Sequence, residues 1–317
     1  MKRTAITFGA LIVVLCALSP VVAQWQGVKQ ARTYVSSTGN DANTCQINAP
    51  CLTFAGAAAK TLAGGEITAI NSGAYGNITI AGSLTLQGAP GVVASMGTSS
   101  TTTPVVIEAH KSAVVVLRNL QINAALSSAN YGVLSSMVGS LSIENCVVTG
   151  FDNGIFVYDG DLSDLSIPKL FLNDSIVQGR VTGLAVADAI SSINRSRFAN
   201  SITGILDITS GNNAEAGHSS ALGATINDCV ITGNSIGISS SSVRTDVENC
   251  IITGNSTGID SYLNGYPGEV NVSNTRISGN VTGVRSQHEL MKIRSFGNNR
   301  LHGNQTNGTF SSTLLQF

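Results

Sequence analysis

Charge is scarce in this chain of 317 residues, because charged side chains make up 11% of it and the formal net charge is −1. No cluster of Lys and Arg provides the electrostatic footprint of a nucleic-acid-binding protein. A disordered chain is also excluded, since disorder requires low hydrophobicity and hydrophobic residues here reach 43%. Proline is rare, whereas 34 glycines and many Ser, Thr and Asn residues suit short strands joined by tight turns.

Long hydrophobic runs are missing after the first 20 residues. Lys2 and Arg3 precede an apolar run over 5–18, and small residues lead to a cut before Gln24. The run is too short, with the wrong flanks, for a membrane span. We therefore expect residues 1–23 to be a signal peptide. The mature protein is expected to be secreted or periplasmic, without a transmembrane segment, and monomeric.

An internal repeat is the most prominent feature of the sequence. Residues 228–238 read DCVITGNSIGI, and residues 249–259 repeat them as NCIITGNSTGI, 21 positions later. Looser copies begin at Asn145, Asp174 and Asn274. A fixed period in the low twenties, with short apolar alternations, predicts a stacked solenoid. The Asn or Asp that begins each copy fits a tight corner with positive φ between two strands.

The repeat predicts an all-β, single-stranded, right-handed parallel β-helix, in which the hand follows the general preference of parallel crossovers. We place the β-helix at 66–317, after an N-terminal arm, a disulfide loop and a short capping helix at 24–65. The helix is expected over 52–62, with Thr53 as N-cap and Gly64-Gly65 as terminator. Its apolar side, with Leu52, Phe54, Ala58 and Leu62, would cover the end of the solenoid.

Four further segments carry a resemblance to a known family. They read TYVSSTGND at 33–41, APCLTF at 49–54, GGEI at 64–67 and GNNRLHGN at 297–304. Together with the repeats they resemble the secreted bacterial parallel β-helix proteins of the pectate-lyase-like superfamily. The resemblance covers about residues 33 to 310 and implies the fold. The superfamily contains lyases, hydrolases and adhesins, so the resemblance does not indicate one activity.

Cysteine usage suggests one disulfide. Cys45 and Cys51 lie close together in a polar, turn-rich stretch, which in an exported protein favours a disulfide over two free thiols. Cys146, Cys229 and Cys250 share one repeat position after the corner. Register stacking would keep the last two near the strand spacing, about 4.8 Å, beyond the Cβ separation that a disulfide prefers. We expect three buried free thiols, and cross-linking of the column is the alternative.

The strand that begins each copy at Gly-Ile predicts an outward surface. Residues one and three positions after the inward Ile should face solvent, and the loops that follow vary most in length. Tyr158, Tyr262 and Tyr266 lie on this strand or its loop and could stack on sugar rings, or pack on their own coil. His288 lies in the same variable region. The candidate binding residues are Tyr158, Asp260, Tyr262, Tyr266, Arg285 and His288.

Two groups of charged residues could carry chemistry. Asp260 and Arg285 fall on adjacent coils, and could be an acid–base pair of a lyase or a plain surface ion pair. Asp159, Asp161 and Asp164 could bind calcium, which is expected only if the protein is a lyase, or could form a solvated acidic loop. Neither a cofactor nor a zinc site is otherwise expected, since four nearby His or Cys ligands are not available.

Two functions from different classes follow from these features. The first is a scaffold with a shallow binding face, for a polysaccharide, and without catalysis. The second is a polysaccharide lyase or glycoside hydrolase acting on an acidic polysaccharide. Against hydrolysis, the blocks of the pectin-hydrolysing members do not occur in order. Gly217-His218-Ser219 lacks the second Gly of a Gly-His-Gly, and Lys292-Ile293-Arg294 reverses an Arg-Ile-Lys.

Overall fold

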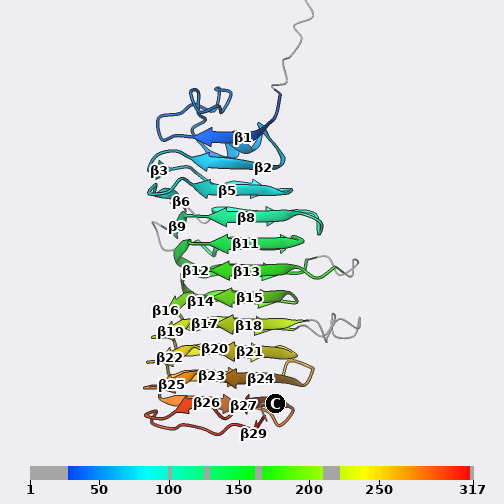
Figure 1. Ribbon diagram of the computed structural model, residues 1–317, viewed down its shortest axis with the longest axis vertical. Coiled ribbons are helices and arrows are strands. Elements are labelled where there is room, and N and C mark those ends of the chain that lie inside the picture. Colours follow the sequence, from blue (N-terminus) through cyan, green and yellow to red (C-terminus); the bar gives the residue numbers. More distant parts are fainter. Residues whose placement is uncertain (1–27, 99–101, 125–128, 161–165, 210–221, 315–317) are drawn as a thin grey trace, which may run out of the picture.

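The computed structural model describes residues 28–98, 102–124, 129–160, 166–209 and 222–314. Within these residues the chain winds into a right-handed parallel β-helix whose coils stack along the long axis of the molecule (Figure 1). All pairings between its named strands are parallel, as the repeat predicts. Each coil contributes strands to three faces.

The first face is a 12-stranded sheet, which forms the front of Figure 1. Its strands are β1 (Gln30–Val35), β2 (Thr61–Ala69), β5 (Leu84–Gly88), β8 (Val114–Arg118), β11 (Ser140–Glu144), β13 (Lys169–Asn173), β15 (Ile190–Asn194), β18 (Gly223–Asn227), β21 (Arg244–Glu248), β24 (Gly268–Ser273), β27 (Met291–Ser295) and β29 (Ser312–Thr313). The stack of strands thus begins at β1, ahead of residue 66.

The second and third faces together form a 17-stranded sheet, because two long strands, β12 (Val147–Tyr158) and β14 (Ile176–Ala187), run through the corner between them. The second face also contains β3 (Gly73–Ala74), β6 (Ala94–Thr98), β9 (Leu120–Ala124), β16 (Arg197–Ala199), β19 (Val230–Thr232), β22 (Ile251–Thr253), β25 (Arg276–Ser278) and β28 (Arg300–Leu301). The third face also contains β4 (Ile78–Ile80), β7 (Val105–Glu108), β10 (Tyr131–Met137), β17 (Thr203–Ile208), β20 (Ile236–Ser241), β23 (Thr257–Ser261) and β26 (Thr282–Ser286).

The corner between the first and second faces depends on residues that tolerate positive φ. Asn145 has φ 50°, Asp228 has φ 54° and Asn274 has φ 44°, and each sits between two strands. Asn and Asp adopt this left-handed conformation more readily than other non-glycine residues. The predicted role of the Asn/Asp position is therefore confirmed, although Arg195 occupies it in one coil with φ 46°.

The next corner, between the second and third faces, is held by an asparagine ladder that the sequence did not predict. Asn234, Asn255, Asn280 and Asn304 stack on successive coils, and the first three are buried. In each step the backbone N–H of one Asn donates to the side-chain oxygen of the next, as from Asn234 to Asn255 at 2.9 Å. Such bonds satisfy polar groups that would be costly to bury alone.

The N-terminal end is capped by α1 (Phe54–Ala58), and the Thr53 side chain accepts a hydrogen bond from the Gly56 backbone at 2.9 Å. The predicted N-cap is confirmed, but the helix is shorter than expected because β2 already begins at Thr61 to pair with β1. Phe54 is buried and packs against Tyr75, with the rings tilted and their centroids 5.1 Å apart. Leu52 and Leu62, expected on the packed side, are exposed instead.

The cysteines follow the prediction. Cys45 and Cys51 form a disulfide with their Cα atoms 4.6 Å apart, whereas Cys146, Cys229 and Cys250 are free and buried. The loop closed by the disulfide lies against β1, where the Tyr34 backbone N–H donates to the Cys45 carbonyl. In the part of the chain that the structure describes, no helix is long and apolar enough to cross a membrane.

Candidate functional site

The outward positions of the third face form two columns in the predicted register. Phe156, Ala185, Leu206, Ser239, Asp260 and Arg285 are partners on successive strands. The second column contains Tyr158, Ala187, Ile208 and Ser241, which are also paired in register. We call β10, β12, β14 and β17 the N-terminal half of this face, and β20, β23 and β26 its C-terminal half.

The N-terminal half carries an aromatic cluster of Tyr131, Phe156 and Tyr158. The rings of Tyr131 and Phe156 are stacked with centroids 5.8 Å apart, and those of Phe156 and Tyr158 with centroids 5.0 Å apart. All three side chains are half-buried. Tyr131 was not among the predicted residues, although its position before Gly132-Val133 resembles the Gly-Ile signal of the repeat. The cluster presents aromatic surface that remains partly accessible.

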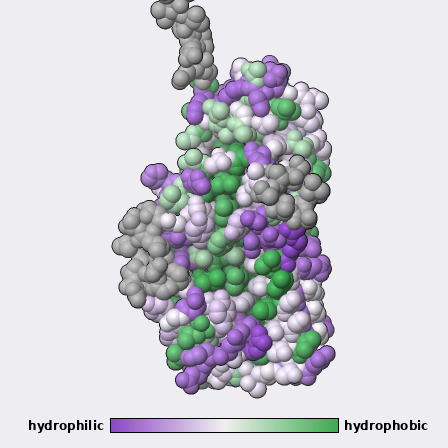
Figure 2. Space-filling model, turned by 180° about the vertical axis from the view of Figure 1, so that it is seen from behind, coloured by the Kyte–Doolittle hydropathy of each residue, from purple (hydrophilic) through white to green (hydrophobic). Residues whose placement is uncertain are grey.

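Apolar side chains extend this surface along the stack. Leu134, Leu206 and Ile208 are half-buried on the outward side of their strands. Figure 2 views the molecule from behind the first face, and there hydrophobic surface forms a band along the long axis with more hydrophilic surface beside it. A shallow, partly apolar face with aromatic rings suits amphipathic ligands more than ions.

Asp159, at the end of this half, is not part of a solvated acidic loop. Its carboxylate oxygen lies 3.0 Å from the Lys111 ammonium, and each of the two side chains is 5% exposed. Lys111, two coils away, already neutralises the carboxylate that a calcium ion would need. Asp161 and Asp164 lie outside the described residues. Among the residues that are described, no three His, Cys, Asp or Glu side chains gather as a metal site.

The C-terminal half carries the predicted pair of Asp260 and Arg285. The guanidinium donates to both carboxylate oxygens, at 2.8 and 3.0 Å, and Gln287 donates to one of them at 2.6 Å. The hydrogen bond to Asp260 raises the pKa of Arg285 above its usual value. The ion pair is confirmed, but it is not a plain surface pair, because the Asp260 side chain is 2% exposed beside a 48% exposed Arg285.

This arrangement bears on catalysis. A lyase base must be free to accept a proton from its substrate. Asp260 accepts three hydrogen bonds from Arg285 and Gln287, and Arg285 is committed to Asp260 as a bidentate partner. The pair therefore resembles a fixed structural contact more than an acid and base awaiting a substrate.

The remaining predicted residues are spread along the third face and its loops. Tyr262 is half-buried in the same column as Tyr158 but four coils away, which is about 19 Å by strand spacing. Tyr266 is half-buried in the loop that follows. His288 is exposed, and its Nδ1 accepts the backbone N–H of Leu290 at 3.1 Å within its own turn. Among the predicted binding residues, Asp260 and Arg285 are joined by an ion pair.

The inward side of the third face also becomes polar from β17 onward. Val157 and Val186 are followed in register by Asp207, Ser240 and Ser261, all buried. Asp207 accepts a hydrogen bond from Thr245 at 2.7 Å, and Thr245 also bonds Ser240 at 2.8 Å. Burial raises the pKa of Asp207 to about 7, despite opposing hydrogen bonds from Thr245 and Ser242. We call these residues, with Ser242, the buried polar cluster.

Sequence reasoning missed the role of Asp207, although strand alternation does place it inward after Ile205. Two of the buried thiols are inert by comparison. Burial raises the pKa of Cys146 to about 12, and a hydrogen bond with Cys229, together with burial, raises that of Cys250. Low thiolate content makes a nucleophilic role for Cys146 and Cys250 unfavourable.

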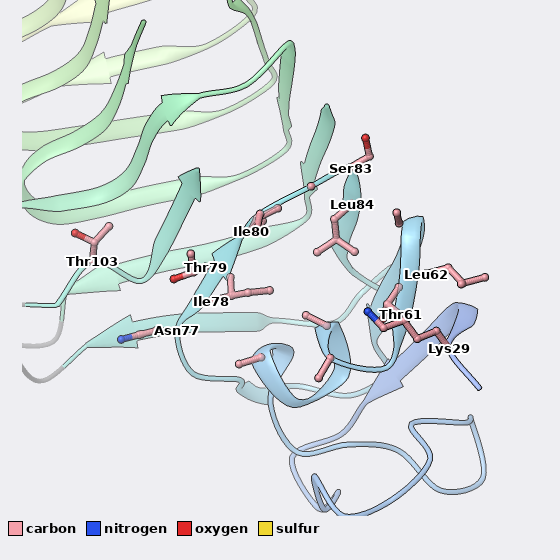
Figure 3. A pocket seen from close by; sticks show the side chains of 16 residues that line it. Lys29, Thr61, Leu62, Asn77, Ile78, Thr79, Ile80, Ser83, Leu84 and Thr103 are labelled. Atoms are coloured by element: carbon pink, nitrogen blue, oxygen red, sulfur yellow. The ribbon is translucent and has the colours of Figure 1, made fainter. Parts of the chain in front are cut away.

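A separate groove of about 660 Å³ lies at the N-terminal end, between α1 and β4 (Figure 3). Apolar side chains including Ile78, Ile80 and Leu84 line it. Lys29, which directly precedes β1, and Thr61, the first residue of β2, line it from another side. No carboxylate or imidazole lines the groove, so it lacks the groups that acid–base chemistry requires. It belongs to the cap and is separate from the aromatic cluster.

Comparison with known proteins identifies the fold. No family model matches the sequence, and no curated protein matches it either. Among solved structures, pectate lyase Pel9A is similar with a TM-score of 0.63 at 15% sequence identity, covering 85% of this chain and 76% of that one. The structure of XylC in complex with xylose is similar with a TM-score of 0.56 at 9% identity, covering 83% and 68%. The protein has the pectate-lyase-like β-helix fold. The identities are too low to carry over an activity.

Proposed function

We propose that this protein is an exported β-helix scaffold that binds carbohydrate through the third face without catalysing its cleavage. The aromatic cluster of Tyr131, Phe156 and Tyr158 is the observation that supports it, because partly accessible rings provide stacking surface for a sugar. Tyr262 and the half-exposed Arg285, which Asp260 holds in place, would provide polar contacts further along the same face. The Cys45–Cys51 disulfide supports export, since disulfides persist in oxidising compartments.

A polysaccharide lyase is the second candidate, and the buried carboxylate of Asp260 beside Arg285 is the feature that favours it. Both groups are hydrogen-bonded to each other, however, and Asp159 is paired with Lys111. Cleavage would require these pairs to open. Binding without cleavage needs no such rearrangement, and this difference makes the scaffold the better-supported function.

The test is a binding screen of purified protein against acidic and neutral polysaccharides, with and without calcium. Phe156→Ala should weaken binding of the best ligand by about fivefold or more, because one stacking contact contributes about 1 kcal/mol beyond its area. Phe171→Ala is the matched control, since Phe171 is an exposed ring on the first face. Release of unsaturated or reducing ends by the wild type would overturn the scaffold proposal in favour of an enzyme. Equal affinity of wild type and Phe156→Ala would exclude the aromatic cluster as the binding surface.

A further inference from the structure

One outward column of the second face differs from the rest of the surface. Strand pairing places Ile176, Arg197, Val230, Ile251, Arg276 and Arg300 next to one another in this order. β22 and β25, which carry part of the column, lie along one edge of the view in Figure 1. The column contains no carboxylate, so its positive charge is not balanced within the strand face.

The arginines of this column are also distinct in their partners. Every other arginine that the structure describes forms an ion pair with an Asp or Glu side chain. Arg197, Arg276 and Arg300 form none with the described carboxylates. Their one side-chain hydrogen bond within the described residues is donated by Arg276 Nε to the neutral hydroxyl of Ser278, at 2.9 Å. The unpaired arginines of the described chain therefore all lie in a single column.

Arg276 and Arg300 are direct partners in this column and line a hollow of about 270 Å³. Ile251 of β22 also lines it, and Asn274 and Asn298 contribute from the corner. The side-chain oxygen of Asn298 accepts the backbone N–H of Asn274 at 3.0 Å, while its amide nitrogen has no partner among the described residues. The hollow thus offers two guanidinium groups and one amide donor, and no carboxylate lines it.

Such a set of donors recognises an oxyanion. Like charges placed directly opposite each other on neighbouring strands are destabilising, and a bound anion reverses the sign of that interaction. Guanidinium groups also match the two oxygens of a carboxylate or phosphate through paired hydrogen bonds. We infer that Arg276, Arg300 and Asn298 form a binding site for the carboxylate or phosphate group of an anionic ligand. The site is on the second face and does not depend on carbohydrate binding by the third.

The inference can be tested by titration calorimetry at low ionic strength. The probes are trigalacturonate for a carboxylate, inorganic phosphate, and maltotriose as a neutral sugar. The wild type should bind at least one anion and should bind it more weakly as salt is added, because salt screens exposed charges. Arg276→Ala and Arg300→Ala should each lower the affinity for the anion by about tenfold, which is the loss expected for one charged hydrogen-bonding partner. Whether trigalacturonate or phosphate binds more tightly identifies the source of the oxyanion.

Two control variants make the test specific. Arg197→Ala removes an unpaired arginine of the same column, three strands and about 14 Å from Arg276, and should change anion affinity by less than about twofold. Phe156→Ala, on the third face, should leave anion binding intact even if sugar binding is lost. Equal weakening by Arg197→Ala would show diffuse attraction and overturn the site. Anion binding that survives loss of both Arg276 and Arg300 would also overturn it, as would the absence of anion binding by the wild type.

Discussion

The two halves of the third face share one backbone and differ in nearly every side chain. In the N-terminal half most outward positions are aromatic or aliphatic, and the inward column contains Val157 and Val186 between Ser135 and Asp207. In the C-terminal half Ser239 and Asp260 face outward, and Ser240 and Ser261 face inward. Strand pairing continues through the change without a shift of register. Backbone pairing therefore sets the fold here, and side chains of either kind are accepted.

The comparison shows how a solenoid tolerates polarity in its core. Each coil contacts mainly its neighbours, so a polar layer needs partners only within that layer and those close to it. The buried polar cluster meets this need in part, because Asp207, Thr245 and Ser240 bond one another. Among the described residues, the buried hydroxyls of Ser241 and Ser261 in the C-terminal half have no hydrogen-bond partner, which costs free energy, and in the N-terminal half that of Ser135 has none. We expect the C-terminal half to be the less stable one.

The largest expected effect concerns Asp207 and pH. The pKa of Asp207 is raised to about 7 in the folded protein, above about 3.9 for an unfolded chain. The folded state therefore binds the proton more tightly. This contribution to stability is fully present below about pH 4 and is lost as pH rises through about 7, amounting to on the order of 4 kcal/mol. Asp207→Asn should remove it, as measured by urea unfolding between pH 4 and pH 8.

Asp246→Asn serves as the control for this measurement, because Asp246 lies beside Thr245 but is only half-buried and paired with Arg244. It should keep the wild-type dependence of stability on pH. If Asp207→Asn and the wild type lose the same stability between pH 4 and pH 8, the buried polar cluster does not titrate as described.

A smaller effect is expected at the Asp260–Arg285 pair. Arg285→Ala leaves a buried carboxylate with Gln287 as its remaining side-chain donor, and should destabilise the protein by about 1–2 kcal/mol after allowance for solvent screening of the half-exposed Arg285. Asp260→Ala frees an arginine that can turn to water, and should cost less than Arg285→Ala. Chemical unfolding of the two variants measures the difference. Equal costs would mean that Asp260 is solvated and that the pair is superficial.

The smallest effect is expected in the column of small residues that follows the Asn/Asp corner, where one coil carries Ser175 and another carries Cys250. The Ser175 hydroxyl donates to the Asn173 carbonyl at 2.8 Å, and Cys250 makes the equivalent contact with the Glu248 carbonyl at 3.1 Å. Cys250→Ser should therefore change stability by less than about 1 kcal/mol, since the hydroxyl finds the same acceptor. Thiol titration of the unfolded, unreduced mature protein should count three cysteines in the wild type and two in the variant. A wild-type count of one would indicate cross-linking of the column.

Much of the third face could be read from the repeat. The Gly-Ile signal placed Phe156, Ser239 and Asp260 in one outward column, and the observed pairing has them there. It could not predict that Asp260 would be buried, because its burial depends on the reach of Arg285 and Gln287 from the next coil. The capping helix was overestimated for a related reason. Local propensity favoured helix to Leu62, while pairing with β1 drew Thr61 into a strand.

The sequence alone determined the parallel β-helix, its Asn/Asp corner and the Cys45–Cys51 disulfide, because these depend on a short repeat and on residues close together in the chain. Tertiary structure decided which side chains meet across coils. Lys111 reaches Asp159 and Thr245 reaches Asp207 over separations of 48 and 38 residues, whereas Arg276 and Arg300 form no ion pair with any described carboxylate. Periodicity specifies the column that a residue occupies. The charge that faces it depends on loop lengths and side-chain reach, which the period does not contain.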